Sequence, residues 1–302
     1  MRKIIIFILL IALVLSLSSC GITKLVKSDK LTIVTTIFPA YDFALHVGGE
    51  KVEVVQLLPA GMESHTYEPT AKDIIFLSEA DLFIYNGGES DAWVDIILDS
   101  LESPIRSIKM MDQVELKFEF GHDHEYDEHV WTSLRNTITI IESIKNALVE
   151  IDEENKDYYE SMANSYIESI SSLDQEFVDF FESYNEPLIF ADKFPFLYMS
   201  EDYGFEYLAA FPGCGHETEP DARTIANIID TVKMLSIPYI FHIEMSNLSI
   251  ANGISDSTGA KMALFHSAHN VSNAEKKNQV TYLSIMENNL ITLKEVLNGS
   301  LD

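Results

Sequence analysis

The stretch from Asn155 to Tyr184 constrains the fold more than any other, because its thirty residues contain no glycine and no proline. Its apolar residues recur at intervals of three and four, as on one face of a helix. They are Tyr159, Met162, Tyr166, Ile170, Leu173, Phe177, Phe180 and Tyr184. At roughly 1.5 Å per residue such a helix spans about 45 Å, more than one small domain needs. We therefore predict a stiff helix that joins two lobes; the alternative is a coiled-coil arm.

On both sides of this helix, short β-rich runs alternate with helical patterns. The predicted strands are Leu31–Phe38, Val52–Leu58, Asp81–Asn86, Ile105–Ile108, Pro187–Ala191, Glu206–Phe211, Ile237–Ile243 and Lys261–His266. The predicted helices are Tyr41–Val47, Thr70–Glu79, Ala92–Leu101, Arg135–Glu150, Phe194–Tyr203, Asp221–Leu235, Asn247–Thr258 and Val280–Leu297. Apolar strands that alternate with helices are typical of parallel sheets covered on both faces. The predicted fold class is therefore α/β, with two parallel-sheet lobes at residues 31–150 and 187–302 joined by a single long rigid helix at 151–186.

Residues 1–19 have the pattern of a bacterial lipoprotein signal peptide. Arg2 and Lys3 precede an apolar run, Ile4 to Leu17, that is shorter than the about 20 residues of a membrane-spanning helix. The following Leu17-Ser18-Ser19-Cys20 resembles a lipobox, in which cleavage leaves the cysteine as the lipidated (palmitate-bearing) N-terminus. We predict an extracytoplasmic protein anchored to the cell membrane through Cys20, with residues 20–30 as a tether. The alternative is a soluble secreted protein with an incidental cysteine.

The charge balance favours cations as ligands. The chain has 20 Lys and Arg against 48 Asp and Glu, a net charge of −28, which argues against nucleic acid, whose phosphates need a basic face. Its only other cysteine is Cys214, so a lipidated Cys20 leaves no intrachain disulfide. We expect Cys214 to be a buried thiol, and a spare ligand or an intermolecular contact are the alternatives.

Residues 121–131 hold His122, His124 and His129 among four carboxylates, with no Lys or Arg. Imidazole suits zinc, copper, nickel and iron, and carboxylates suit harder ions such as manganese. A solvated acidic loop is the alternative. The stretch passes at Val130-Trp131 into apolar residues, so His129 is predicted at a boundary between loop and core, where metal ligands are usually held.

Four loops that follow predicted strands carry candidate ligands. In open α/β sheets, ligands bind beyond the carboxyl ends of the strands. The candidates in these loops are His65, His129, Asp192 and His266. Two come from each lobe, which predicts a tetrahedral or five-coordinate metal site between the lobes. His269 and His216 are alternatives for the second lobe, and Asp192 could instead be a helix N-cap or pair with Lys193.

Several longer motifs occur along the chain in the same order as in a known family. They are Thr36-Ile37-Phe38-Pro39, Leu57-Leu58-Pro59-Ala60-Gly61, His65-Thr66-Tyr67-Glu68-Pro69, Ala80-Asp81-Leu82-Phe83-Ile84-Tyr85-Asn86-Gly87-Gly88, Glu128-His129-Val130-Trp131, Glu217-Thr218-Glu219-Pro220 and Thr258-Gly259-Ala260-Lys261. With them, nearly all of the mature chain resembles the metal-binding lipoproteins of bacterial ABC importers for zinc and manganese (cluster A-I), in particular the zinc-binding branch. The resemblance implies the metal-type periplasmic binding protein fold, in which one long helix joins two lobes.

The resemblance also implies ligand roles, and here the chain departs from the family. His65 and His129 match the first two ligands. The third is usually a histidine after the first strand of the second lobe, where Asp192 is the best substitute in this chain. The fourth is usually acidic at the end of the last strand, where this chain offers His266. His122 and His124 are similar to a shortened form of the mobile loop of zinc-specific members, which would capture ions weakly.

The predicted function is capture of a divalent transition metal in the cleft and delivery to an ABC permease, by a monomer that is not an enzyme. Zinc is the first choice because three histidines with one carboxylate suit it, and manganese is the second. A surface-anchored zinc hydrolase is one alternative, but the chain has neither His-Glu-x-x-His nor G-x-S-x-G. An adhesin with a structural metal is the other; it would unfold on chelation, whereas a transport component would not.

Overall fold

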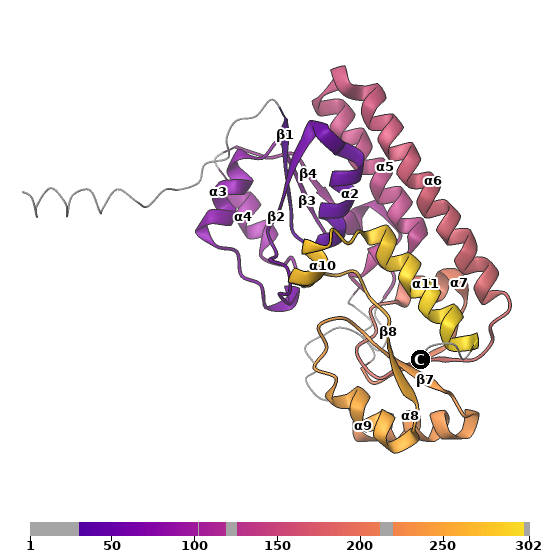
Figure 1. The fold of residues 1–302 in the computed structure, drawn as a ribbon. Helices are drawn as coiled ribbons and strands as arrows, with labels where there is room; N and C mark the ends of the chain where they lie inside the picture. Colours follow the sequence, from indigo (N-terminus) through magenta and orange to yellow (C-terminus); the bar gives the residue numbers. More distant parts are fainter. Residues whose placement is uncertain (1–29, 102, 119–125, 212–219, 299–302) are drawn as a thin grey trace, which may run out of the picture.

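The computed structural model describes residues 30–101, 103–118, 126–211 and 220–298, and it has two α/β lobes (Figure 1). The first lobe contains a parallel sheet in the order β2-β1-β3-β4. Its strands are β1 (Leu31–Thr35), β2 (Val52–Gln56), β3 (Leu82–Tyr85) and β4 (Ser107–Lys109). Helices cover this sheet, so the central strand β3 is buried along its whole length, as its uninterrupted apolar sequence requires.

Local sequence signals set the helix ends in the first lobe. Helix α2 (Phe38–Gly48) has a proline in its first turn, where the missing N–H costs nothing. Its C-cap is Gly49, whose positive φ of 52° is unfavourable for residues with a Cβ. Thr70 and Asp73 form a capping box at the start of α3 (Ala71–Glu79). The lobe also includes α4 (Val94–Ser100) and the 3-10 turns η1 (Gly49–Lys51), η2 (Ser64–Thr66), η3 (Met110–Gln113) and η4 (Val130–Thr132).

The second lobe repeats this topology. Its parallel sheet has the order β6-β5-β7-β8, the same pattern of crossovers as in the first. The strands are β5 (Leu188–Phe190), β6 (Tyr207–Ala209), β7 (Tyr239–His242) and β8 (Lys261–Leu264), and the helices are α7 (Leu197–Tyr203), α8 (Ala222–Leu235), α9 (Ser249–Thr258), α10 (Asn273–Lys277) and α11 (Tyr282–Asn298). Because all these strands are parallel, the loops that carry ligands leave each sheet at one edge.

The long helix α6 (Lys156–Phe181) runs from one lobe to the other (Figure 1). It follows α5 (Leu134–Ile151) and the turn η5 (Glu153–Asn155), and it packs along α5. Within the first lobe, Tyr166 donates a 2.7 Å hydrogen bond to Asp42 of α2. Near its other end, Phe177 stacks on Tyr203 of α7, with ring centroids 5.2 Å apart. The predicted long helix and the two-lobe α/β fold are thus confirmed.

One apolar core is continuous through both lobes, from Ile33 to Val296, and includes Trp131, Phe177 and Tyr282. Each lobe also has one smaller apolar cluster of its own, on the other face of its sheet. A shared core resists the large hinge opening that separate domains allow. Among the described residues, the structure contains no helix with the length and apolar composition needed to cross a bilayer.

Every strand and every α-helix of the described residues except α10 matches an element predicted from the sequence, with ends that differ by up to three residues. The difference that affects the site is at the end of β8, which lies at Leu264 and not at His266 as predicted. Phe265 N–H still donates to the His242 carbonyl at 2.9 Å, and beyond it the side chain of Asn289 holds the backbone of His266. Cys20 and Cys214 lie outside the described residues.

Candidate metal centre

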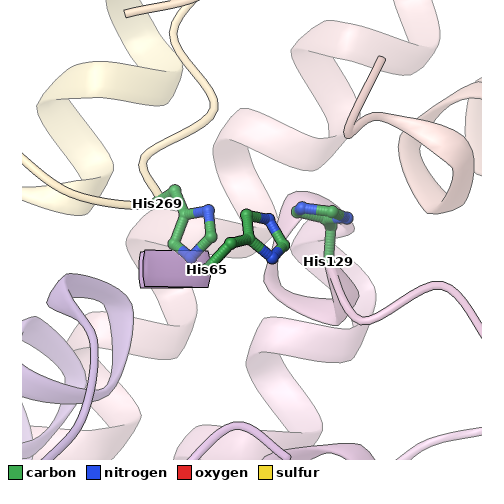
Figure 2. A group of neighbouring side chains, drawn as sticks. All are labelled: His65, His129 and His269. Atoms are coloured by element: carbon green, nitrogen blue, oxygen red, sulfur yellow. The ribbon is translucent and has the colours of Figure 1, made fainter. Parts of the chain in front are cut away.

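Three histidines converge where the two lobes meet. His65 lies in η2 after β2, His129 lies before η4 after β4, and His269 lies in the loop after β8. One ring nitrogen of each is within 4.8 Å of the others, and Figure 2 shows the three rings turned toward one another. Nitrogens at 2.0–2.1 Å from a tetrahedral zinc ion are about 3.3 Å apart, so the rings fit this ion after each moves by roughly 1 Å.

Hydrogen bonds hold two of the rings from behind. Oδ1 of Asp127 lies 3.0 Å from Nδ1 of His129 and accepts the His129 backbone N–H at 2.7 Å. Nδ1 of His65 lies 3.2 Å from Oγ of Ser90, which donates to Glu128. In both histidines this leaves Nε2 for a metal, and such partners set the tautomer and the direction of a ligating ring.

The third ring, that of His269, is held by one hydrogen bond and by packing. Oγ of Ser64 lies 2.7 Å from Nε2 of His269. The indole of Trp131 packs against His129 and His269, with centroid separations of 5.3 and 5.0 Å. Trp131 is fully buried and donates from Nε1 to the Ser267 carbonyl at 2.9 Å. A rigid indole of the first lobe therefore supports a ligand from each lobe.

Burial and neighbouring charges favour the neutral forms of two of these histidines, His65 and His269. Burial lowers the pKa of His65; the charge of Glu128 opposes this effect, and those of His129 and Lys193 add to it. Burial, together with the charges of His129, His65 and Lys193, holds the pKa of His269 well below its usual value. Metal binding requires the neutral imidazole, so these shifts reduce competition from protons.

The structure does not bring His266 into this group. Its Nδ1 accepts from Ala268 N–H and lies 3.5 Å from Glu244, while Nε2 lies 3.4 Å from Glu275. The side-chain amide of Asn289, on α11, accepts a hydrogen bond from the backbone N–H of His266 and donates one to its carbonyl, each at 2.8 Å. Burial alone would lower the pKa of His266, but Glu244 and Glu275 outweigh it and raise this pKa. Both ring nitrogens of His266 thus face groups outside the three-histidine group, and His269, three residues later, lies beside His65 and His129 instead.

Asp192 is not in the group either. Its Oδ2 accepts the Ile243 N–H at 3.3 Å, and its Oδ1 accepts the Lys193 N–H at 2.9 Å. These bonds join the end of β5 to the end of β7. The N-cap of α7 is Phe196, so Asp192 is not a cap of this helix either. His122 and His124 lie outside the described residues.

The sequence suggests for the next residue, Lys193, only a pairing with Asp192, yet Lys193 lines a pocket together with His65 and His269. No periodicity in the sequence signals this, because Lys193 follows the last strand residue by three positions and its direction depends on the bend before α7. The signal available for His269 was its position close behind the last predicted strand, next to the polar residue Asn270.

Comparison with known proteins shows the family of the chain. Residues 33–296 match the family model for the zinc-uptake complex component A, periplasmic. The chain belongs to this family. The family is that of a component of an uptake complex and not of an enzyme. The zinc-binding lipoprotein AdcA of Streptococcus pneumoniae is 32% identical over 279 residues, which are 88% of this chain and 56% of the relative. The high-affinity zinc uptake system protein ZnuA of Bacillus subtilis is 28% identical over 284 residues, 90% of this chain and 89% of the relative.

A solved structure of a family member has the same fold. The Zn(II)-bound ZnuA-like domain of Streptococcus pneumoniae AdcA superposes with a TM-score of 0.75 at 32% identity, over 88% of this chain and 98% of that domain. The chain thus spans about 56% of the whole streptococcal protein and nearly all of its ZnuA-like domain.

Proposed function

We propose that this zinc-uptake family member captures zinc outside the cytoplasm and delivers it to the permease of an ABC importer. The observation that carries this proposal is the convergence of His65, His129 and His269 from two lobes in a chain of this family. Zinc is the proposed cargo because three neutral imidazoles suit it better than manganese, which prefers oxygen ligands. In this proposal the lobes are residues 31–150 and 187–302, the link is 151–186, and the protein acts as a monomer.

The proposed ligand from the second lobe is His269, in place of His266 and Asp192. A ligand must release its proton before it binds metal. His269 has a lowered pKa and faces the other two rings, whereas His266 has a raised pKa and faces two carboxylates. Asp192 is engaged by two backbone N–H groups.

Single substitutions test this ligand set. Alanine at His65, His129 or His269 should lower the zinc affinity by more than about 100-fold. This exceeds the loss of affinity of about 10–100-fold that is typical when a residue that hydrogen-bonds a metal ligand is replaced. His266→Ala and Asp192→Ala are the matched controls from the same lobe and should change it less. Competition with a chromophoric zinc chelator measures each affinity. Loss of binding in His266→Ala, with retention in His269→Ala, would refute the proposed set.

The identity of the cargo is tested separately. Protein purified from its native envelope without chelators or added metal should contain zinc in stoichiometric amount by elemental analysis. Manganese in its place would refute the zinc proposal and leave the transport role intact. After chelation the apoprotein should remain folded by circular dichroism; unfolding would support a structural metal instead.

Membrane attachment is the remaining part of the proposal. We propose that lipidated Cys20 anchors the mature protein, because it follows an apolar run and a lipobox-like sequence. Cys20→Ala should shift the protein from membranes to the soluble fraction or block processing. Intact mass without an added lipid on Cys20 would contradict the anchor.

We also propose that His122 and His124 help to collect zinc before it reaches the main site. A double alanine variant should slow uptake at low zinc and leave the equilibrium affinity nearly unchanged, because neither residue belongs to the three-histidine group. Loss of equilibrium binding in this variant would place the main site in their loop.

A further inference from the structure

One side chain, that of Asn270, joins the loop that carries His65 to the loop that carries His269. Asn270 follows His269 directly and is buried, with 2% of its surface exposed. Its Nδ2 donates hydrogen bonds to the backbone carbonyls of Pro59 at 2.8 Å and of Met62 at 2.9 Å. Because Met62 stands three residues before His65, these two bonds connect the neighbourhoods of two ligands that belong to different lobes.

The acceptor side of the same amide is engaged as well. Oδ1 of Asn270 accepts from Nε2 of Gln56 at 3.3 Å and from the backbone N–H of Val271 at 2.9 Å. The N–H of Gly61 donates to the Val271 carbonyl at 2.8 Å. These contacts together form a loop clasp between residues 56–62 and 270–271. An amide offers two donor hydrogens beside an acceptor oxygen, so neither a hydroxyl nor a carboxylate at position 270 could make all four side-chain bonds.

The loop clasp assembles part of the metal site from protein atoms alone. It lies next to His65 on one side and next to His269 on the other, and Oγ of Ser64 adds a contact of 2.7 Å to Nε2 of His269. The ligand nitrogens of the three-histidine group lie within 4.8 Å of one another. A set of ligands that is already assembled spares the binding ion the free energy of ordering two loops.

Zinc and manganese depend differently on such an assembled set. Zinc in protein sites is mostly tetrahedral, with bonds of about 2.0–2.1 Å to imidazole, so it needs the three nitrogens at one spacing. Manganese prefers octahedral sites rich in oxygen, and water can complete its coordination where an imidazole is displaced. Sites made of nitrogen and oxygen ligands select among divalent metals largely through geometry. A clasp that fixes the spacing of two imidazoles therefore favours zinc.

We propose that Asn270 is a positioning residue of the metal site: through the loop clasp it fixes the separation of His65 and His269, and this spacing favours zinc over manganese. The inference rests on the proposed metal-binding function and specifies how that site selects its cargo. Asn270 acts through the two loops and is not itself a ligand.

Asn270→Ser tests the inference on the full-length protein, because a hydroxyl donates one hydrogen where the amide donates two. The zinc affinity should fall by about 10-fold or more, as is typical when a residue that positions a metal ligand is replaced. The manganese affinity should change by less than about threefold, since this ion depends less on the spacing of the imidazoles. Competition with a chromophoric chelator measures zinc, and the electron paramagnetic resonance signal of free manganese measures manganese.

Ile254→Ala is the matched control for a loss of stability. Ile254 is fully buried in the smaller apolar cluster of the second lobe, so its truncation leaves a cavity without touching either ligand loop. This variant should be less stable than the wild type and should keep the wild-type ratio of zinc to manganese affinity.

Hydrogen exchange measures the clasp directly. In the metal-free wild type the Gly61 amide should exchange slowly with deuterated solvent, because its bond to the Val271 carbonyl is closed before an ion binds. In Asn270→Ser the same amide should exchange faster.

Four results would overturn the inference. An unchanged zinc affinity in Asn270→Ser, or an equal loss for zinc and manganese, would show that Asn270 does not select the ion. An equal fall of the affinity ratio in Ile254→Ala would trace that fall to stability alone. Fast exchange of the Gly61 amide in the metal-free wild type would mean an open clasp, a result that decides the matter even if Asn270→Ser does not fold. A wild-type protein that bound neither metal would instead refute the proposed metal-binding function, which is a distinct outcome.

Discussion

Asp127 illustrates how one residue outside the three-histidine group controls a ligand. The side-chain Oδ1 of Asp127 accepts a hydrogen bond from the backbone N–H of His129 and lies 3.0 Å from Nδ1 of the same residue. The backbone carbonyl of Asp127 accepts a hydrogen bond from the hydroxyl of Tyr198, in the second lobe, at 2.8 Å. The carboxylate therefore sets the direction of the imidazole and makes the nitrogen that faces the metal more basic.

Asp127→Asn should lower the zinc affinity by about 10–100-fold, because the amide keeps the shape but loses the charge behind His129. The matched control is Asp112→Asn, an exposed residue of η3 that pairs with Lys109. Chelator competition measures both variants. An unchanged affinity in Asp127→Asn would show that packing against Trp131 alone orients His129.

The contact between His266 and Glu275 predicts a pH effect on stability. The contact with His266, whose Nε2 lies 3.4 Å from Oε1 of Glu275, lowers the pKa of Glu275 to about 2. The two carboxylates near His266 raise its own pKa despite burial. The stabilisation from Glu275 is present above its unfolded pKa and is lost as the pH falls toward about 2. The stabilisation from His266 is complete below its unfolded pKa of about 6.5 and is lost as the pH rises through the folded value.

Glu275→Gln should therefore destabilise the metal-free protein more at about pH 5.5 than at about pH 8.5, by about 1 kcal/mol, since the pair is partly exposed. Glutamine keeps an oxygen for the capping box with Ser272. Urea unfolding at the two pH values measures the difference, with the exposed Glu287→Gln on α11 as control. Equal destabilisation at both pH values would indicate a lost cap and not a lost ion pair.

At the scale of elements, α6 is stable because a single stripe of its side chains is buried against both lobes. Tyr159, Ala163, Ile170 and Phe177 have no exposed surface, while the opposite face is charged and polar. The helix thus contributes to the core that the lobes share, and this burial stabilises it more than its intrinsic helix propensity does.

Ile170→Ala should lower the free energy of unfolding by about 2–5 kcal/mol, because it leaves a cavity in a fully buried part of the core. Glu168→Ala, two residues earlier on the exposed face, should change it by less than about 0.5 kcal/mol. Urea unfolding followed by circular dichroism compares the two. A loss below about 1 kcal/mol in Ile170→Ala would mean that the stripe is loosely packed.

At the scale of the whole molecule, the lobes are tied to each other around the site even without metal. Nε1 of Trp131 donates a hydrogen bond to the Ser267 carbonyl at 2.9 Å. The hydroxyl of Tyr282 donates a hydrogen bond to the Trp131 carbonyl at 2.6 Å. Asn270 donates to the carbonyls of Pro59 and Met62 in the loop that leads to His65, at 2.8 and 2.9 Å. The ligand loops are therefore held near their binding positions by direct contacts and by the shared core.

Zinc should stabilise the protein without a large change of shape. At 100 times its dissociation constant the ion adds about 2.7 kcal/mol by mass action, which should raise the melting temperature of the wild type and not that of His129→Ala. Small-angle X-ray scattering of the metal-free and zinc-loaded forms should superimpose, because backbone movements of about 1 Å or less suffice. A clear decrease in the radius of gyration would instead show hinge closure between the lobes.

The sequence by itself determined the elements and their connection. Hydrophobic periods of two and of three to four specify the strands and helices, including α6, because local burial patterns follow from the geometry of each element. His65 and His129 were also predictable as members of the group, since each stands at a boundary between a polar loop and a motif that packs into the core. The short helix α10 was missed because its five residues bury nothing.

Tertiary structure alone decided which residues of the second lobe reach the site. At the ends of β8 and β5, contacts from distant segments set the directions of the side chains. Asn289 of α11 holds the backbone of His266, and Ile243 N–H binds Asp192. These contacts turn both predicted ligands away from the group and leave His269 to face His65 and His129, with Lys193 at the adjoining pocket.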